Sequence, residues 1–231
     1  GGIAPNVVPA KATVRHLVRS RNLPGLADLV ARVHAISEGA ALMSGVRVDS
    51  KVFSAVSNLL GNRPLEEAMQ AEFDALGPVP FDDNDEKFAA EIRATLTKDD
   101  IADTFRLLNM KPDYDMALCD FVAPLDRLFV GGIGSTDVGD VSWAVPTVQA
   151  NVATCAVGTP FHTWQLTAQG KEPFAHKGMI HAAKVMAATA RAMILSDELR
   201  TSAKKAHAKH LVAFPYECPI PTDVHPPVID F

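Results

Sequence analysis

The 231-residue chain has the length of one large domain or two modest ones. Hydrophobic residues make up 48% of it and charged residues 21%, which is enough apolar material to fill a sizeable core. A net charge of −5 gives no sign of binding to nucleic acid or to a membrane surface, and three widely spaced cysteines exclude a disulfide framework and a CxxC zinc site.

The first 60 residues alternate between strand and helix patterns. Polar and apolar side chains alternate over residues 6–19 and again over residues 46–56, which predicts strands with one solvated face. Between them, apolar residues over 25–43 repeat at helical spacing, and Gly45 ends the pattern. The order strand, helix, strand predicts a small α+β module with helices on one side of an antiparallel sheet.

Three helices are expected before the amino-acid composition of the chain changes near residue 120. Asn62 is placed to cap the first, and Gly77 ends it. Apolar residues around Ile92 mark the second, and a short third helix follows from Lys98. The acidic stretch at residues 81–85 is interpreted as a solvated loop.

Beyond residue 120 the chain is rich in Val, Gly, Ser and Thr. Valine-rich runs bounded by turn-forming residues predict short β segments at residues 141–145 and 148–156. Helices are expected again at residues 178–196 and 197–211, followed by an irregular proline-rich tail.

Two groups of polar residues in this region could carry chemistry. Asp137 and Asp140 lie in the Gly-flanked stretch "GSTDVGD", where a rigid scaffold could present catalytic groups, although Asp and Ser also make turns by bonding their own backbone. The spacing alone favours turns. His162 stands beside Trp164 in "GTPFHTWQ". An exposed pair could bind a flat or anionic ligand, and a core tryptophan with a capped histidine fits the residues equally well.

Three further histidines are candidate metal ligands. His176 precedes an alanine-rich helix, and neutral imidazole is the commonest metal ligand. A catalytic centre needs at least three protein ligands, however, and the chain has no HxD pair, so the residues alone favour a structural histidine. His207 and His210 could chelate a metal from one helix face, but a solvated basic face explains them better.

Six blocks occur in an order that resembles the M20 family of metal-dependent amidohydrolases and peptidases. The blocks are "GGIAPNVVPAKATVRHLVRS", "ISEGAALMSG", "NRPLEEAM", "GSTDVGDVSWAVPTVQ", "GTPFHTWQ" and "AHKGMIHAAKVMAATA". The resemblance runs from residue 1 to about residue 225. Each short block alone is unspecific, and their order over this length makes the resemblance specific.

The resemblance implies an α/β fold in two domains. Residues 1–60 would form most of a ferredoxin-like lid, or dimerisation, domain with a four-stranded antiparallel sheet. Residues 61–231 would form the C-terminal part of a mixed-sheet catalytic domain. A homodimer through the lid is implied, and a second subunit is compatible with it. The chain has no apolar run of bilayer length and no export signal at residues 1–20, so a cytoplasmic location is expected.

The resemblance also implies cleavage of the amide bond of an N-acyl or N-aroyl amino acid, with p-aminobenzoyl-glutamate as the preferred candidate, by water activated on two zinc or manganese ions. His176 would be the last metal ligand, and Asn6, Arg19, Asp137 and His162 would bind substrate. The general base and the other metal ligands are expected upstream of this chain, which would therefore be inactive alone. The alternative is a non-catalytic dimerising module or partner subunit.

Overall fold

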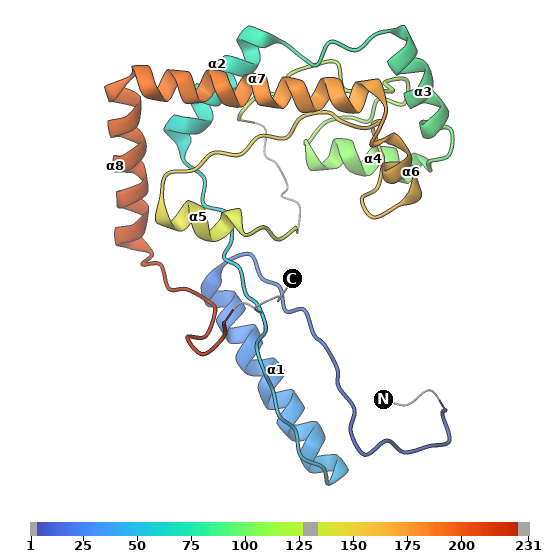
Figure 1. The fold of residues 1–231 in the computed structure, drawn as a ribbon, viewed down its shortest axis with the longest axis vertical. Coiled ribbons are helices and arrows are strands. Elements are labelled where there is room, and N and C mark those ends of the chain that lie inside the picture. The colour runs from blue at the N-terminus through green and yellow to red at the C-terminus, as the bar shows by residue number, and fades with distance from the viewer. Residues whose placement is uncertain (1–3, 127–133, 226–231) are drawn as a thin grey trace, which may run out of the picture. The chain divides into compact units, whose positions relative to one another are not determined.

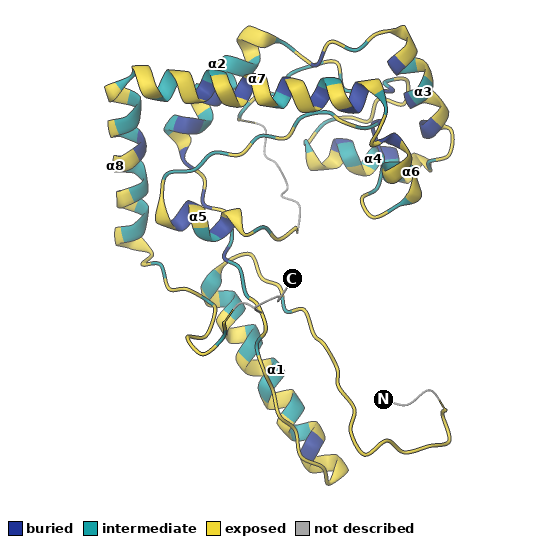
Figure 2. Ribbon diagram, in the orientation of Figure 1, coloured by how far each residue is buried: buried dark blue, intermediate teal, exposed yellow. Residues whose placement is uncertain are grey.

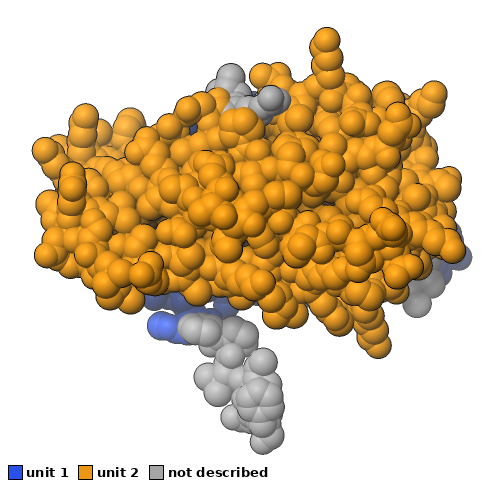
Figure 3. Space-filling view, turned by 90° about the horizontal axis from the view of Figure 1, so that it is seen from above, with its two compact units in different colours: residues 1–58, 218–231 blue, residues 59–217 orange. Residues whose placement is uncertain are grey.

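The computed structural model describes residues 4–126 and 134–225 (Figure 1), and all regular secondary structure within these ranges is helical. The helices are α1 (Leu23–Ser44), α2 (Arg63–Leu76), α3 (Asp83–Arg93), α4 (Lys98–Leu107), α5 (Val138–Ala144), α6 (Trp164–Gln169), α7 (Pro173–Leu195) and α8 (Asp197–Ala213). The chain divides into two compact units, residues 1–58 with 218–231, and residues 59–217 (Figure 3). The assignment of residues 1–60 to a lid and of 61–231 to a catalytic domain stays a prediction.

The expected α/β fold, with its ferredoxin-like lid and mixed sheet, is wrong for the part of the chain that the structure describes. Residues 6–19 and 46–56 alternate in polarity as expected, but they contain no strand. An alternating sequence becomes a strand only when a neighbour pairs with its backbone and covers its apolar face. Neither happens here among the described residues, and Val8 and Val14 remain 94% and 72% exposed.

The β segments expected at residues 141–145 and 148–156 are also wrong. Residues Val138–Ala144 form α5 instead, and no strand covers 148–156. Tertiary contacts outweigh the β preference of the valines, because Ser142 is fully buried and its hydroxyl accepts the Leu60 backbone N–H at 2.8 Å. Residues 127–133, which precede this stretch, lie outside the described residues.

The first unit contains α1 and extended connections. Asn22 caps α1 by accepting the Gly25 N–H at 2.9 Å, and the helix ends at Gly45, which has the positive φ of 65° that glycine adopts without strain. Little of this unit is buried: among its described residues only Ala41 and Ser57 are.

The second unit is organised around α7, which packs against α2 and α8. Asn62 caps α2 as expected, and its side-chain amide also donates to the Ala203 carbonyl of α8 at 3.0 Å. Figure 2 shows that α7 buries one side and leaves the other exposed. The predicted helices are confirmed. The ends agree within two residues for 25–43, 61–78 and 197–211, whereas α7 begins five residues before the predicted start at residue 178; the two helices between are α3 and α4.

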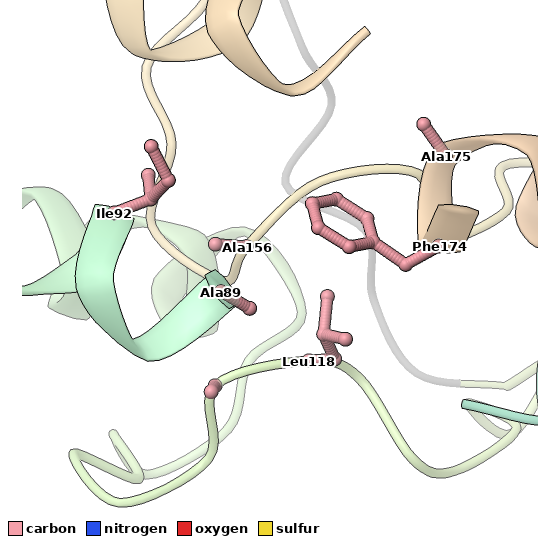
Figure 4. Packing of buried hydrophobic residues seen from close by; sticks show 7 residues of the cluster. Ala89, Ile92, Leu118, Ala156, Phe174 and Ala175 are labelled. Carbon is pink, nitrogen blue, oxygen red and sulfur yellow. The ribbon is translucent and has the colours of Figure 1, made fainter. Parts of the chain in front are cut away.

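The core of this unit brings distant segments together (Figure 4). Ile92 and Ala89 of α3, Leu118 and Ala156 of two loops, and Phe174 of α7 pack in one cluster. A second cluster joins α4 to Val157 through Ile101 and Phe105. These clusters hold the start of α7 against the loop that precedes α6.

No helix in the described ranges has the length and apolar character needed to span a membrane.

Candidate functional site

A hollow of about 430 Å³ lies along the N-terminal part of α7. It contains His176, the predicted metal ligand, whose side chain is exposed in the first turns of the helix. The lining residues are Pro80, Lys171, Pro173, His176, Lys177, Ile180, His181 and Lys184. We refer to this feature as the basic hollow, because three of its residues are lysines.

Lys177, one of the residues that line the basic hollow, is tied to the start of α3 by ion pairs. The Lys177 ammonium group donates to Asp82 and to Asp85, with both N–O distances at 2.5 Å. Asp82 caps α3, and Asp85, whose side chain is 2% exposed, accepts the Asp82 backbone N–H in return. The interpretation of residues 81–85 as a solvated loop is therefore wrong, because the stretch starts a helix and buries one carboxylate.

This ion pair predicts how stability depends on pH. The hydrogen bond from Lys177 lowers the pKa of Asp82, and the bonds to Asp82 and Asp85 raise the pKa of Lys177. A lowered carboxyl pKa adds stability that is complete above about pH 4 and is lost as the pH falls through the folded-state pKa. A raised ammonium pKa adds stability that is complete below about pH 10 and is lost as the pH rises through the folded-state pKa.

We therefore expect the difference in urea midpoint between the parent and Lys177→Met to be largest between about pH 5 and 9 and to shrink below about pH 4. Urea titrations of both proteins at about pH 3, 4, 5 and 7 measure it. A difference that stays constant down to about pH 3 would contradict the pairing.

His181 lies on the same helix, at the border between the hollow and the core. It is 5% exposed, and its ring centroid is 6.4 Å from that of Phe73 on α2. Its Nε2 atom is buried and has no hydrogen-bond partner among the described residues. A buried ring nitrogen without a partner is costly, so this atom calls for a further polar group.

The loop before α6 presents the predicted His162. Gly158 and His162 have positive φ angles of 92° and 65°. Phe161 and Trp164 are exposed, Trp164 by 61%, so the alternative of a core tryptophan is wrong. His162 is exposed as well, and binding of a ligand by this pair stays a prediction.

Buried Gln169 holds this loop in shape. It is 1% exposed, its carbonyl oxygen accepts the Ala156 N–H at 2.6 Å, and its amide donates to Thr159 at 3.1 Å and to the Gln165 carbonyl at 3.0 Å. Residues 170–172 join α6 directly to the start of α7. The short loop before α6 therefore lies at the same end of α7 as His176.

Asp137 and Asp140 lie at the start of α5. Asp137 is exposed and makes no side-chain cap bond, and Asp140 accepts a hydrogen bond from Tyr216 at 2.7 Å. Helices α5 and α6 lie apart in Figure 1. In the first unit, Asn6 and Arg19 are exposed on a segment without regular structure.

His207 and His210 pack against neighbouring segments. The expectation that they lie on a solvated basic face is therefore wrong. His207 Nε2 lies 3.0 Å from the Ser142 carbonyl, to which it donates, and the His210 ring lies 5.4 Å from Trp143 and 5.2 Å from Phe214. Both rings therefore attach α8 to its neighbours.

Two of the cysteines show no sign of thiolate chemistry. Burial raises the pKa of the Cys119 thiol and that of the Cys155 thiol, which keeps both protonated. Cys218 is exposed.

The described residues do not by themselves make a metal site. No group of three or more His, Cys, Asp or Glu side chains placed to hold a metal ion is found within 4–126 and 134–225. Around His176 the neighbouring charged groups of the hollow are lysines, which repel a cation. His176 offers one imidazole, and a catalytic divalent ion needs at least three protein ligands.

Comparisons with known proteins bear on this arrangement. No family model matches the chain, and no solved structure matches it. A curated protein of Escherichia coli (strain K12) is 39% identical over 236 residues, which cover 98% of this chain. The chain is similar to a subunit of p-aminobenzoyl-glutamate hydrolase. The closeness to this protein that the motifs predict is thereby confirmed, and the chain spans 49% of the relative's length.

Most of the basic hollow could not be predicted from the sequence. Lys171 lies six residues before Lys177. Lys177 and Lys184 are seven residues apart on α7, a spacing that places both on one face of the helix. That spacing is the one signal that could have found them, but it is equally typical of a solvated face. The partner of Lys177 is more than ninety residues away in sequence, so only the fold shows it.

Proposed function

We propose that this chain is the C-terminal part of an M20-type metal-dependent amidohydrolase that cleaves the amide bond of an N-acyl or N-aroyl amino acid. The observation that supports it is 39% identity, over nearly the whole chain, to a protein named as part of a p-aminobenzoyl-glutamate hydrolase. In p-aminobenzoyl-glutamate a single amide joins an aromatic acyl group to glutamate, so hydrolysis releases p-aminobenzoate and glutamate. We take this compound as the substrate.

Two divalent metal ions, zinc or manganese, are part of the proposal and would supply Lewis-acid activation of water. His176 would donate its imidazole to one of them. The other ligands and the general base would come from the part of the protein that this chain does not span. No step is assigned to the metals from the residues described here, because one imidazole does not define their positions.

The remaining predicted residues would act on the substrate. Arg19 would bind a carboxylate, which suits its planar, bidentate guanidinium group. Asn6 would reach a neighbouring active site across a homodimer formed by the lid, and Asp137 and His162 would line the site. The name of the relative describes one subunit of an enzyme, which supports a second subunit for this protein too.

The test is the variant His176→Ala in the full-length protein. Loss of a ligand should cost more than loss of a residue that merely orients one, so we expect kcat/KM for p-aminobenzoyl-glutamate to fall by more than about 100-fold. Bound metal, measured by elemental analysis, should fall with it. Exposed His225 provides the control, and His225→Ala should change neither quantity.

Full metal occupancy in His176→Ala would remove this residue from the ligand set. If the parent protein hydrolyses no N-acyl or N-aroyl amino acid, alone or with a second subunit, the chain belongs instead to a non-catalytic dimerising module or partner subunit.

A further inference from the structure

Helix α7 carries apolar side chains on its exposed side as well as on its buried side (Figure 2). Phe174 and Val185 are fully buried, whereas Met179, Met186 and Ile194 are 57%, 61% and 73% exposed. Intervals of three, four and seven residues place the exposed apolar residues on one side of the helix. We call this side the outer face of α7, and it consists of Met179, Ala183, Met186, Ala187, Ala190 and Ile194.

The charged residues of α7 do not cover the outer face. Lys177, Lys184 and Arg191 follow one another at intervals of seven residues, so they form a single edge beside it. A helix at the surface of a protein normally has a polar side opposite its apolar side, and a helix that is apolar nearly all round is typical of a buried layer. Helix α7 is therefore suited to apolar contacts on both sides, and the described residues cover one of them.

A second helix of the same unit shows the same pattern independently. In and just after α5, Val138, Val141 and Val145 are 36%, 51% and 50% exposed, whereas Ser142 and Trp143 are buried. Apolar side chains that gather on one exposed side mark a surface that binds another part of a protein. Two helices of the second unit thus have uncovered apolar sides, as expected of a unit that lacks a neighbouring layer.

The comparison of lengths indicates what covers the outer face. The relative from Escherichia coli matches 98% of this chain, but the match covers only 49% of the relative. The other half of such a protein is about as large as the chain itself, which is enough to form a further layer. Alanines at the centre of the outer face let another backbone approach closely, and the methionines beside them can adapt their shape to it.

We propose that the outer face of α7 is buried against an uncharged, apolar surface of the part of the full-length protein that this chain does not span. Lys184 and Arg191 would lie at the polar rim of this contact. The inference rests on the proposed function only in taking the chain as part of a longer protein, and it involves neither the metals nor the substrate.

A second copy of this chain fits the outer face less well. In an antiparallel pair of α7 helices the same edge of each helix would meet, so that Lys184 of one copy would lie near Arg191 of the other. Like charges in such positions oppose association.

Labelling of an introduced thiol tests the burial directly. Ala190 of the outer face and Ala208 of α8 are both exposed alanines inside long helices, so they form a matched pair. In the full-length protein we expect the thiol of Ala190→Cys to react with a maleimide at least about tenfold more slowly than that of Ala208→Cys, because only the first is covered. Peptide mass spectrometry assigns the label to its position and so separates it from exposed Cys218. Thermal melting checks that each variant is folded.

The 231-residue chain alone provides the reference, because both positions are exposed in it and should react at similar rates. Equal rates in the folded full-length protein would overturn the proposal. Slow reaction at position 190 that is already present in the 231-residue chain, and that disappears on dilution to monomers, would identify a second copy as the occupant and overturn it too. A full-length protein that hydrolyses no N-acyl or N-aroyl amino acid would leave the ratio of labelling rates unchanged, so failure of the proposed function is distinguishable from failure of this inference.

Discussion

Replacing Gly178 with Ala should lower the free energy of unfolding by about 1–3 kcal/mol, the range typical of overpacking in a core. Gly178 lies on the buried face of α7, where the helix crosses residues 153–154. A Cβ atom there would lie 2.1 Å from the Ala153 carbonyl oxygen and 2.9 Å from the Thr154 methyl group. The first contact is with backbone, which cannot rotate away, so α7 or the loop must move.

The chain offers a matched control for this substitution. Gly39 also lies inside a helix, α1, and a Cβ atom there would meet nothing within 4 Å. Gly39→Ala should therefore stabilise the protein or leave it unchanged, with a gain of up to about 1 kcal/mol from helix propensity. Urea unfolding of both variants measures the difference. Equal stability of Gly178→Ala and the parent would show that the close approach is not real.

The second large effect is expected for Lys177→Met, which leaves the buried Asp85 carboxylate without its cation. Removing one partner of a buried pair is strongly destabilising, so we expect the urea midpoint of Lys177→Met at about pH 7 to lie clearly below that of the parent protein. The loss falls on the contact between α3 and α7, since Asp85 belongs to the cap of α3.

A double-mutant cycle isolates this interaction. Asp85→Asn removes the buried charge, so adding Lys177→Met to it should cost much less than Lys177→Met alone, with a coupling of at least about 1 kcal/mol. Lys184→Met, on the same helix and without a carboxylate partner among the described residues, should change stability by less than about 0.5 kcal/mol. Additive effects of the two substitutions at Lys177 and Asp85 would contradict the pairing.

The helices could be predicted from the sequence because their signals are local. Asn62 before Pro64, and the glycines Gly45 and Gly77 after apolar stripes, act within one or two turns of the residues that they control. The stretch at residues 81–85 shows where this fails. Its acidic residues fit a solvated loop or a helix start equally well, and the choice depends on Lys177, far along the chain.

The sheets could not be predicted in the same way, because a strand depends on its neighbours. Alternation over residues 6–19 shows which side chains could face a core, but the pairing partner is not written in the segment itself. Residues Val138–Ala144 show the reverse error, a predicted strand that is a helix. Val138 and Val141 are β-branched and favour strands, yet they lie in α5, where Ser142 and Trp143 are buried.

The candidate site was predicted in part. Residue type and order selected His176 and His162, which flank one end of α7, through resemblance rather than through spacing. The lysines of the basic hollow and the unpartnered nitrogen of His181 became visible only in three dimensions, because exposure and missing partners are properties of the fold.

The network around Gln169 has a consequence for motion. One side chain bonds the Ala156 amide, the Thr159 hydroxyl and its own helix, so none of these groups can separate without breaking a shared bond. The loop and α6 should then open as a single cooperative unit rather than fray residue by residue. The backbone that carries Phe161, His162 and Trp164 would then keep its shape, and an incoming molecule would meet it with less backbone entropy left to lose.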